Sequence, residues 1–261
     1  MSDTLEAIRK LTTDERLGAA VTIVAGAGIG AKGVLDADGA WLAGSIPEDV
    51  ADDVVTDAVE LMLREQSRTL SYGERDVFIE TIAPQPRIIV FGAGHIAQPL
   101  VRIARELGYR VTIADARKAW ATPERFPDVD ELIVGWPDAV FERYELDGRT
   151  YVVLLSHDAR FEDPVFPAIR NSPIRYIGAL GSRRTATLRE ERLIGEGWAA
   201  EEIARIHAPI GIDIGAEEPA EVAVAIMAEI TRVRYGHGSG LSLKGQQGRV
   251  HPQRGDEPGT T

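Results

Sequence analysis

The chain of 261 residues contains no cysteine. This absence excludes disulfides, thiolate metal sites, iron–sulfur ligation and thiol nucleophiles, because all of them need a cysteine sulfur. The sequence also lacks an apolar run near the roughly 18 residues that a membrane-spanning helix requires. The opening residues, MSDTLEAIRK, lack the apolar core of a secretory signal. We therefore expect a protein without membrane insertion that works in the cytoplasm.

Positive charge is scarce as well. The chain has 29 Lys and Arg against 41 Asp and Glu, a formal net charge of −12. A nucleic-acid binder needs many cations to neutralise phosphates, so we expect no nucleic-acid partner, although one small basic pocket remains compatible with this charge. The apolar share of 44% and the charged share of 27% are those of an ordinary globular protein.

Residues 1–84 have the pattern of a small α+β domain, and the stiff PQP segment at 84–86 suits a domain boundary. Asp38-Gly39 is a strong turn signal and predicts a hairpin. The expected elements are a helix over 4–11, strands over 19–24 and 76–83, and a helix over 47–65.

The start of that second helix carries its own signal. Ser45 is followed three residues later by Glu48. This spacing predicts a capping box, in which each side chain hydrogen-bonds a backbone amide of the helix's first turn, with Ser45 as the N-cap. Pro47 is compatible with the first turn of a helix.

Residues 86–235 alternate apolar runs with helical stretches, which is typical of parallel βαβ units. We predict a Rossmann-like, doubly wound sheet closed by a long helix over 219–234. A tail over 236–261, rich in Gly, Pro and charge, is expected to be disordered. The predicted strands are 87–91, 110–114, 131–134, 151–155 and 174–178.

Two glycine-rich stretches resemble nucleotide-binding loops, VAGAGIGAKG at 24–33 and VFGAGHIAQP at 90–99. A dinucleotide loop needs a strand before it and a helix after it, because the helix amides face the phosphates. The first stretch leads into a hairpin. It does not match a P-loop either, because Lys32 lies between Ala31 and Gly33, whereas a P-loop has Gly before its Lys and Ser or Thr after it. We therefore interpret residues 26–33 as a flexible turn or a bulged strand connection.

The second stretch has the required context. Gly92 allows the tight turn after the strand RIIVF, and Gly94 lets the backbone approach a pyrophosphate. Apolar periodicity predicts a helix from His95 to Leu107. Asp115 follows the next strand, where an acid can accept hydrogen bonds from a ribose. The alternative interpretation is a turn that packs small residues and binds nothing tightly.

Polar residues also follow the fourth and fifth predicted strands, at the edge where open α/β sheets bind ligands. Ser156 is followed by His157, a weak candidate for a general acid or base, and by Asp158. Adjacent residues at a strand end tend to diverge, so this pair does not imply a catalytic dyad. Among the histidines we find no metal-ligand spacing and predict no metal site.

The segment GSRR at Gly181–Arg184 is a candidate anion site. Ser182 is suited to cap a helix, and Arg183 and Arg184 lie beside the free amides of its first turn. The alternative is a capped helix with two solvated arginines. The segment HAPIGIDIG at 207–215 is too apolar and glycine-rich for an exposed loop. We expect its backbone to be ordered and to pack over another group, which the sequence does not identify.

Several long motifs resemble the Rossmann domain of the XdhC/CoxI family of accessory proteins for molybdenum hydroxylases. They are IIVFGAGHIAQPL, ADARKAWATPERFPDVDE, LLSHD, YIGALGSRR and HAPIGIDIGAEEPAEVAVAIMAEI, which together cover residues 86–235. The resemblance implies a non-enzymatic factor that binds and protects the molybdenum cofactor, assists its sulfuration by a cysteine desulfurase, and delivers it to a client such as xanthine dehydrogenase or carbon monoxide dehydrogenase.

The alternative is an NAD(P)-dependent oxidoreductase that uses the same pocket, in which Arg117 could receive a 2′-phosphate. Members of the family that the chain resembles typically carry a cysteine in the GS stretch of the N-terminal domain. This chain continues there with IPEDVADDV, so it has no thiol that could carry sulfur. A homodimer through helix 47–65 or the closing helix is a further hypothesis. The expected cofactor-binding residues are Gly92, Gly94, His95, Ile96, Asp115, Arg117, Ser156, His157, Asp158, Gly181, Ser182, Arg183, Arg184 and His207.

Overall fold

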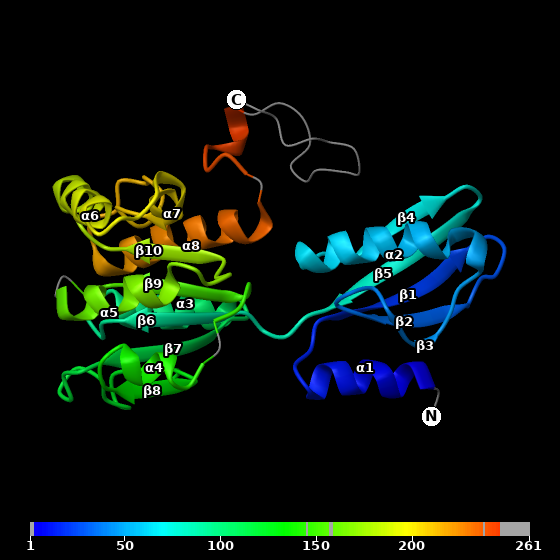
Figure 1. Cartoon of the computed structure of the whole chain (residues 1–261), viewed down its shortest axis with the longest axis horizontal. Coiled ribbons are helices and arrows are strands. Elements are labelled where there is room, and N and C mark those ends of the chain that lie inside the picture. Colours follow the sequence, from blue (N-terminus) through cyan, green and yellow to red (C-terminus); the bar gives the residue numbers. More distant parts are fainter. Residues whose placement is uncertain (1–2, 145, 157–158, 237, 246–261) are drawn as a thin grey trace. The chain divides into compact units, whose positions relative to one another are not determined.

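The computed structural model describes residues 3–144, 146–156, 159–236 and 238–245 (Figure 1). The chain forms two compact units, Met1–Gln85 and Pro86–Thr261. Within the described residues, no helix combines the length and apolar character needed to cross a membrane.

The N-terminal unit is an antiparallel five-stranded sheet with the order β3-β2-β1-β5-β4 and one helix on each face (Figure 1). Side chains of β1, β5 and α2 form its core, which includes Val21, Val54 and Ile79. The elements are α1 (Asp3–Thr13), β1 (Gly18–Ala25), β2 (Lys32–Asp36), β3 (Trp41–Gly44), α2 (Glu48–Leu63), β4 (Arg68–Tyr72) and β5 (Arg75–Ile82).

The predicted capping box of α2 is wrong. The helix begins at Glu48, its N-cap is Pro47 with φ −52°, and no side chain caps its amides. The Pro47 carbonyl accepts a hydrogen bond from the amide of Val50. Ser45 lies two residues before the cap, so the rigid proline, and not Ser45, sets where the helix starts.

The interpretation of the first glycine stretch is confirmed. It forms the turn of a β1–β2 hairpin, with Gly26, Gly28 and Gly30 all at positive φ. The pairing of β1 with β5 shifts register between Ile23 and Ala25, which is a bulge next to the turn. The second hairpin, between β2 and β3 at Asp38-Gly39, also forms as expected. Strand β4, which pairs with β5 across a turn at Gly73, was not predicted.

Replacing Gly28 and Gly30 with alanine tests whether this turn binds a ligand. The two residues have φ of +81° and +88°, so an alanine at each should cost about 1 kcal/mol of unfolding free energy. Titration of the folded double variant should give wild-type affinity for nucleotide or cofactor, whereas Gly92→Ala should weaken binding. Equal loss of affinity in both variants would mean that the first stretch contacts the ligand.

The C-terminal unit confirms the predicted fold class. Six parallel strands have the order β11-β10-β9-β6-β7-β8, which is the doubly wound Rossmann arrangement. The strands are β6 (Arg87–Phe91), β7 (Arg110–Asp115), β8 (Glu131–Val134), β9 (Thr150–Leu154), β10 (Tyr176–Ala179) and the short β11 (Ile206–His207). The fifth strand starts two residues later than the predicted 174–178, and β11 was not expected.

Helices cover both faces of this sheet (Figure 1). One core contains α3 and α8, with Leu100 and Ile226 fully buried, and the other contains α4, α5 and α6, with Phe166 and Leu193 buried. The helices are α3 (Ala97–Glu106), α4 (Asp138–Phe141), α5 (Ala159–Ile169), α6 (Arg183–Gly195), α7 (Ala200–Ala204) and α8 (Pro219–Tyr235).

The closing helix α8 ends at Gly236, which takes the left-handed conformation typical of a helix C-terminus. Beyond it lies a 3₁₀ turn, η1 (Leu243–Gly245). Residues 246–261 of the tail predicted to be disordered lie outside the described residues.

Candidate functional site

The candidate site lies where the strand order of the parallel sheet reverses, between β6 and β9. Chain connections leave this point in opposite directions, and open α/β sheets generally bind their ligands at such a point, outside the carboxyl ends of the strands. Gly92 follows β6 at φ +111°, and a Cβ built on it would lie 3.0 Å from the backbone nitrogen of Ser156. Ser156 itself is buried. Glycine is therefore required at residue 92 for the two loops to meet.

The glycine loop runs from Gly92 to Ile96, and helix α3 begins at Ala97, two residues later than predicted. No atom of the described residues lies within 4 Å of a Cβ built on Gly94, so this part of the chain leaves room for a ligand at its backbone. His95 is exposed, and its ring lies edge-on to Trp120 with the centroids 5.5 Å apart. The loop thus has the shape expected of a phosphate-binding turn.

Asp115 is fully buried at the end of β7. Its Oδ2 accepts a hydrogen bond from the backbone N–H of Ala93 in the glycine loop at 2.8 Å. Arg117 donates to both carboxylate oxygens, from Nε and from Nη2, and its backbone N–H donates to Oδ1. Burial alone would raise the pKa of Asp115, but these hydrogen bonds hold the pKa below its usual value. The role of Asp115 as a ribose acceptor stays a prediction, and a ribose could reach it only after Arg117 moved.

Two residues that the sequence reasoning did not single out, Trp120 and Arg125, cover the glycine loop. Arg125 Nη1 donates to the carbonyl oxygens of Ala93, at 2.9 Å, and of Trp120, at 2.7 Å. The guanidinium carbons of Arg117 and Arg125 lie 4.8 and 4.7 Å from the Trp120 ring centroid. In the sequence, Trp120 lies between Arg117 and Arg125, a short distance after Asp115. That Trp120 and Arg125 contact the glycine loop could not be predicted from this spacing, because the contact depends on the fold.

The GSRR segment opens α6 as predicted. Ser182 is the N-cap, and its Oγ accepts a hydrogen bond from the backbone N–H of Thr185. Arg183 and Arg184 are exposed, and neither has an ion-pair partner among the described residues. Because β10 pairs with β9, this segment lies on the same sheet edge as Ser156. Its function as an anion site stays a prediction.

His207 lies in a hydrogen-bonded network on the last strand. Its Nδ1 lies 3.2 Å from Oε1 of the buried Glu229 on α8, and its ring stacks on Tyr176 with the centroids 4.7 Å apart. Glu229 also accepts hydrogen bonds from the hydroxyl of Tyr176 and the amide of Gly211. Burial would raise the pKa of Glu229, but these partners hold it below its usual value, while burial raises the pKa of Tyr176.

The segment that follows, 207–215, packs over β10 and α8. The amide of Ile210 donates to the carbonyl of Ala179, and the buried Ile210 side chain occupies the space that a Cβ on Gly178 would need. Ile210, Gly211 and Ile212 pack on the protein's own sheet edge and closing helix, as expected. The expectation that the segment is not exposed is wrong for Pro209 and for residues 213–215, which include Ile214 at 49% exposure.

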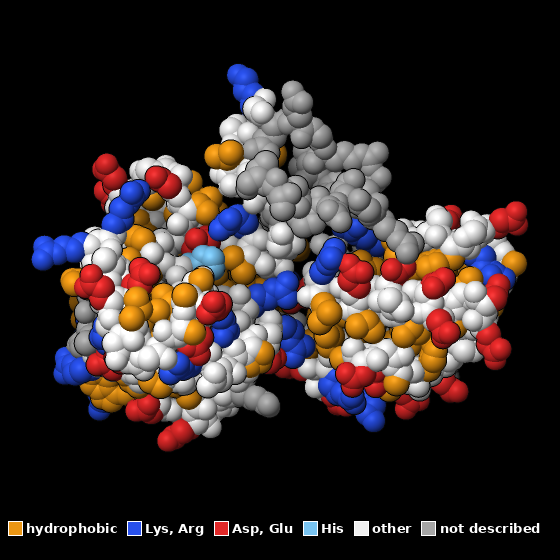
Figure 2. All heavy atoms as spheres, turned by 45° about the horizontal axis from the view of Figure 1, so that its top comes forward, with side chains coloured by type: hydrophobic (Ala, Val, Ile, Leu, Met, Phe, Trp, Pro, Cys, Tyr) orange, Lys and Arg blue, Asp and Glu red, His pale blue; other side chains and the backbone are white. Residues whose placement is uncertain are grey.

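The remaining predicted residues are His157 and Asp158, which lie outside the described residues. Within the described ranges, no group of three His, Asp or Glu side chains could hold a metal ion. On the face shown in Figure 2, acidic and basic side chains are intermingled over each unit, so positive charge is not gathered into a broad patch there.

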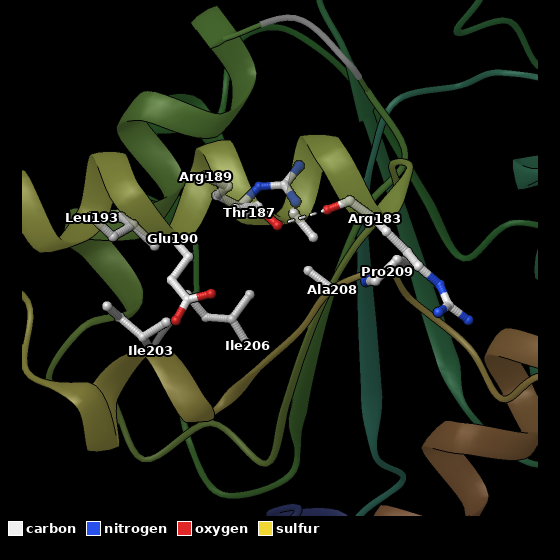
Figure 3. A pocket seen from close by; sticks show the side chains of 10 residues that line it. Arg183, Thr187, Arg189, Glu190, Leu193, Ile203, Ile206, Ala208 and Pro209 are labelled. Carbon is white, nitrogen blue, oxygen red and sulfur yellow. Dashed lines mark hydrogen bonds between the residues drawn. The ribbon is translucent and has the colours of Figure 1, made fainter.

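A separate cavity of about 270 Å³ lies beside α6, lined by side chains of α6, α7 and the segment from Ile206 to Pro209 (Figure 3). On the α6 side, the buried Arg189 forms two hydrogen bonds with Glu162 of α5. Arg183 is shared between this cavity and the GSRR segment.

A family model described as the XdhC Rossmann domain matches residues 88–230. This range contains the glycine loop, Asp115, Ser156, the GSRR segment and His207.

Several curated proteins are similar to the chain, and two of them carry a descriptive name. A Bacillus subtilis protein described as a probable xanthine dehydrogenase subunit is 32% identical over 159 residues, or 61% of this chain and 46% of that protein. The molybdenum cofactor insertion chaperone PaoD of Escherichia coli is 34% identical over 151 residues, or 58% of this chain and 41% of PaoD. The chain thus spans less than half the length of each.

A crystal structure described as a xanthine dehydrogenase from Bacillus halodurans superposes with a TM-score of 0.53 at 18% identity, covering 93% of this chain and 98% of that one. At this level of identity, the likeness concerns the fold alone.

Proposed function

Because this chain belongs to the family of the XdhC Rossmann domain, we propose that it is an accessory factor in the maturation of a molybdenum hydroxylase of the xanthine dehydrogenase or carbon monoxide dehydrogenase type. Its cargo is the molybdenum cofactor, which it binds, holds during sulfuration and delivers to the client enzyme. The proposal includes a cytoplasmic location and no catalysis by the chain itself.

The observation that carries the proposal is the presence of backbone amides and exposed arginines along one sheet edge of an acidic chain. Among the described residues, none covers the backbone of Gly94 in the glycine loop after β6. The exposed Arg117 hydrogen-bonds Asp115, which accepts the amide of Ala93 in the same loop. Two strands away, the exposed Arg183 and Arg184 stand at the first amides of α6. A phosphorylated pterin can use both sets, because amides and guanidiniums bind phosphate oxygens.

The partners of this proposal follow from the absence of cysteine. Sulfur must be added to the cargo by another protein, because this chain has no thiol that could carry it. We propose a cysteine desulfurase for that step and a molybdenum hydroxylase as recipient. A homodimer through α2 or α8 is part of the proposal, since each helix carries an exposed apolar side chain, Leu63 at the end of α2 and Val224 in the second turn of α8.

The alternative, an NAD(P)-dependent oxidoreductase, uses the same loop but needs a proton donor facing the substrate. The candidate donor was His157. The engagement of Asp115 by Arg117 counts against the usual recognition of a ribose diol by such enzymes.

Native mass spectrometry of the protein purified from its own host tests the proposal. The expected result is a retained molybdenum cofactor, and the complex should activate the cofactor-free client when the two are mixed. Hydride transfer from NADH or NADPH to a panel of small carbonyl compounds at an ordinary enzymatic rate would instead establish the oxidoreductase.

A further inference from the structure

The cavity beside α6 is bordered by two opposite charges that have no partner in the described part of the chain. Arg183 and Glu190 both line it. Both are exposed, and neither forms an ion pair among the described residues. They lie seven residues apart on α6, which is two helical turns, or about 10 Å, along one face. Figure 3 shows the Arg183 guanidinium and the Glu190 carboxylate at opposite ends of the cavity.

The surface between these two charges is small or apolar. Ala186 and Thr187 lie between Arg183 and Glu190 on α6. The hydroxyl of Thr187 donates to the carbonyl of Arg183 at 3.2 Å, so it is already satisfied within the helix. The rest of the lining is mainly aliphatic, from Leu193, Ile203, Ile206, Ala208 and Pro209. The middle of the cavity therefore suits an apolar side chain, whose burial is favourable.

A buried cation that also lines the cavity retains one unused donor. The side chain of Arg189 is 4% exposed. Its Nε and Nη2 donate to Glu162, and Nη2 also donates to the carbonyl of Leu180. Its Nη1 has no hydrogen-bond partner among the described residues. A buried donor without an acceptor costs free energy, so an acceptor brought by an occupant would stabilise Arg189.

These features fit a protein segment better than a nucleotide. A polyanion would be attracted by Arg183 but repelled by Glu190. At about 270 Å³, the cavity is also smaller than the roughly 300 to 1,000 Å³ of typical small-molecule sites. A protein segment can place an acidic side chain opposite Arg183, a basic one opposite Glu190 and an apolar one between them. It also brings backbone carbonyls as acceptors for Arg189.

The residue shared with the neighbouring site indicates which partner the segment belongs to. Arg183 lines the cavity and is also part of the GSRR segment, the proposed anion site for the cargo. An acidic side chain that pairs with Arg183 in the cavity takes this cation away from the cargo. Such a loss suits the protein that receives the cofactor. It does not suit a desulfurase, because the cargo must stay bound while sulfur is added.

We propose that the cavity beside α6 is the docking site for a segment of the molybdenum hydroxylase client, and that the docked segment weakens the hold of Arg183 on the cargo. The segment carries an apolar side chain between an acidic and a basic one. This rests on the proposed function, which supplies both the client and the cargo.

Binding of the cofactor-free molybdenum hydroxylase of the same host, measured by biolayer interferometry, tests the docking site. Thr187→Trp fills the middle of the cavity, and Glu190→Lys reverses the charge at one end. Each should weaken binding by about tenfold or more, since one blocks the apolar contact and the other sets like charges against each other. The loss in Glu190→Lys should shrink as salt is raised, because exposed charges are screened, whereas the loss in Thr187→Trp should remain.

The matched controls are the next residues on the helix. Leu188→Trp and Glu191→Lys make similar changes at exposed residues outside the described lining, and both should bind the client like the wild type. Circular dichroism verifies folding, and if Thr187→Trp does not fold, Glu190→Lys and its salt dependence still decide. Client binding as tight in the cavity variants as in the controls would overturn the docking site. Loss of desulfurase binding or of self-association instead of client binding would overturn it too.

Release of the cargo tests the second part. From the wild type loaded with molybdenum cofactor in the absence of oxygen, added client should speed release by about tenfold, a usual size for coupling between two sites. From Glu190→Lys it should not, although this variant should hold the cofactor as tightly as the wild type when no client is present. Equal release with and without client would refute the coupling. If the chain binds no cofactor at all, the proposed function fails, while the client titrations still decide the docking site.

Discussion

Replacing Arg183 and Arg184 together with glutamine is expected to lower activation of the molybdenum hydroxylase client by at least about tenfold to a hundredfold, the range for losing one charged hydrogen bond to an anion at about 1.5 to 3 kcal/mol. Glutamine keeps most of the side-chain bulk. Both arginines are exposed, and the cap formed by Ser182 on the Thr185 amide is untouched, so the fold should survive. The loss should appear as weaker binding of molybdenum cofactor.

The control for this variant removes two positive charges from another part of the chain. Arg9→Gln combined with Arg64→Gln changes two exposed arginines of the N-terminal unit, and it should activate the client normally. If the Arg183 and Arg184 variant activates the client as well as this control does, the GSRR segment is only a capped helix with two solvated arginines. Weak NAD⁺ binding at the glycine loop should persist in both variants.

Removing the carboxylate of Glu162 should have the largest effect on stability. Glu162 accepts hydrogen bonds from Nε and Nη2 of Arg189 at 3.0 and 2.6 Å, and Arg189 is 5% exposed. Glu162→Ala leaves a buried guanidinium without its counter-ion, which costs about 3 to 5 kcal/mol. Urea denaturation measures this loss, and hydrogen exchange assigns it to the Rossmann unit.

Two comparisons identify the cause of that loss. Glu131→Ala breaks an exposed pair with Arg143 and should cost less than about 1 kcal/mol. Glu162→Leu combined with Arg189→Met replaces both ions by apolar side chains of similar volume and should recover most of the stability. A double variant as unstable as Glu162→Ala would mean that the loss comes from packing and not from the unpaired charge.

Local patterns in the sequence were enough to predict the fold class and the ends of the strands that carry the site. These patterns are apolar runs alternating with helical periodicity, a glycine turn directly after a strand, and a serine in front of an amphipathic stretch. Gly92, Asp115 and Ser182 therefore lie where the sequence predicted them, at the carboxyl edge of a doubly wound sheet. The capping box at Ser45 failed on equally local grounds, because Pro47 fixes the helix start.

What each charged side chain contacts could be learned from the tertiary structure alone. Arg125 reaches the carbonyl of Ala93 across 32 residues of chain, and Glu162 meets Arg189 across 27. His207 has its partner, Glu229, on another element. Even the contact between Asp115 and Arg117, two residues apart, depends on the direction in which the chain leaves β7. A buried charge takes the nearest complementary group that packing supplies, and that group is set by how distant elements come together and not by sequence spacing.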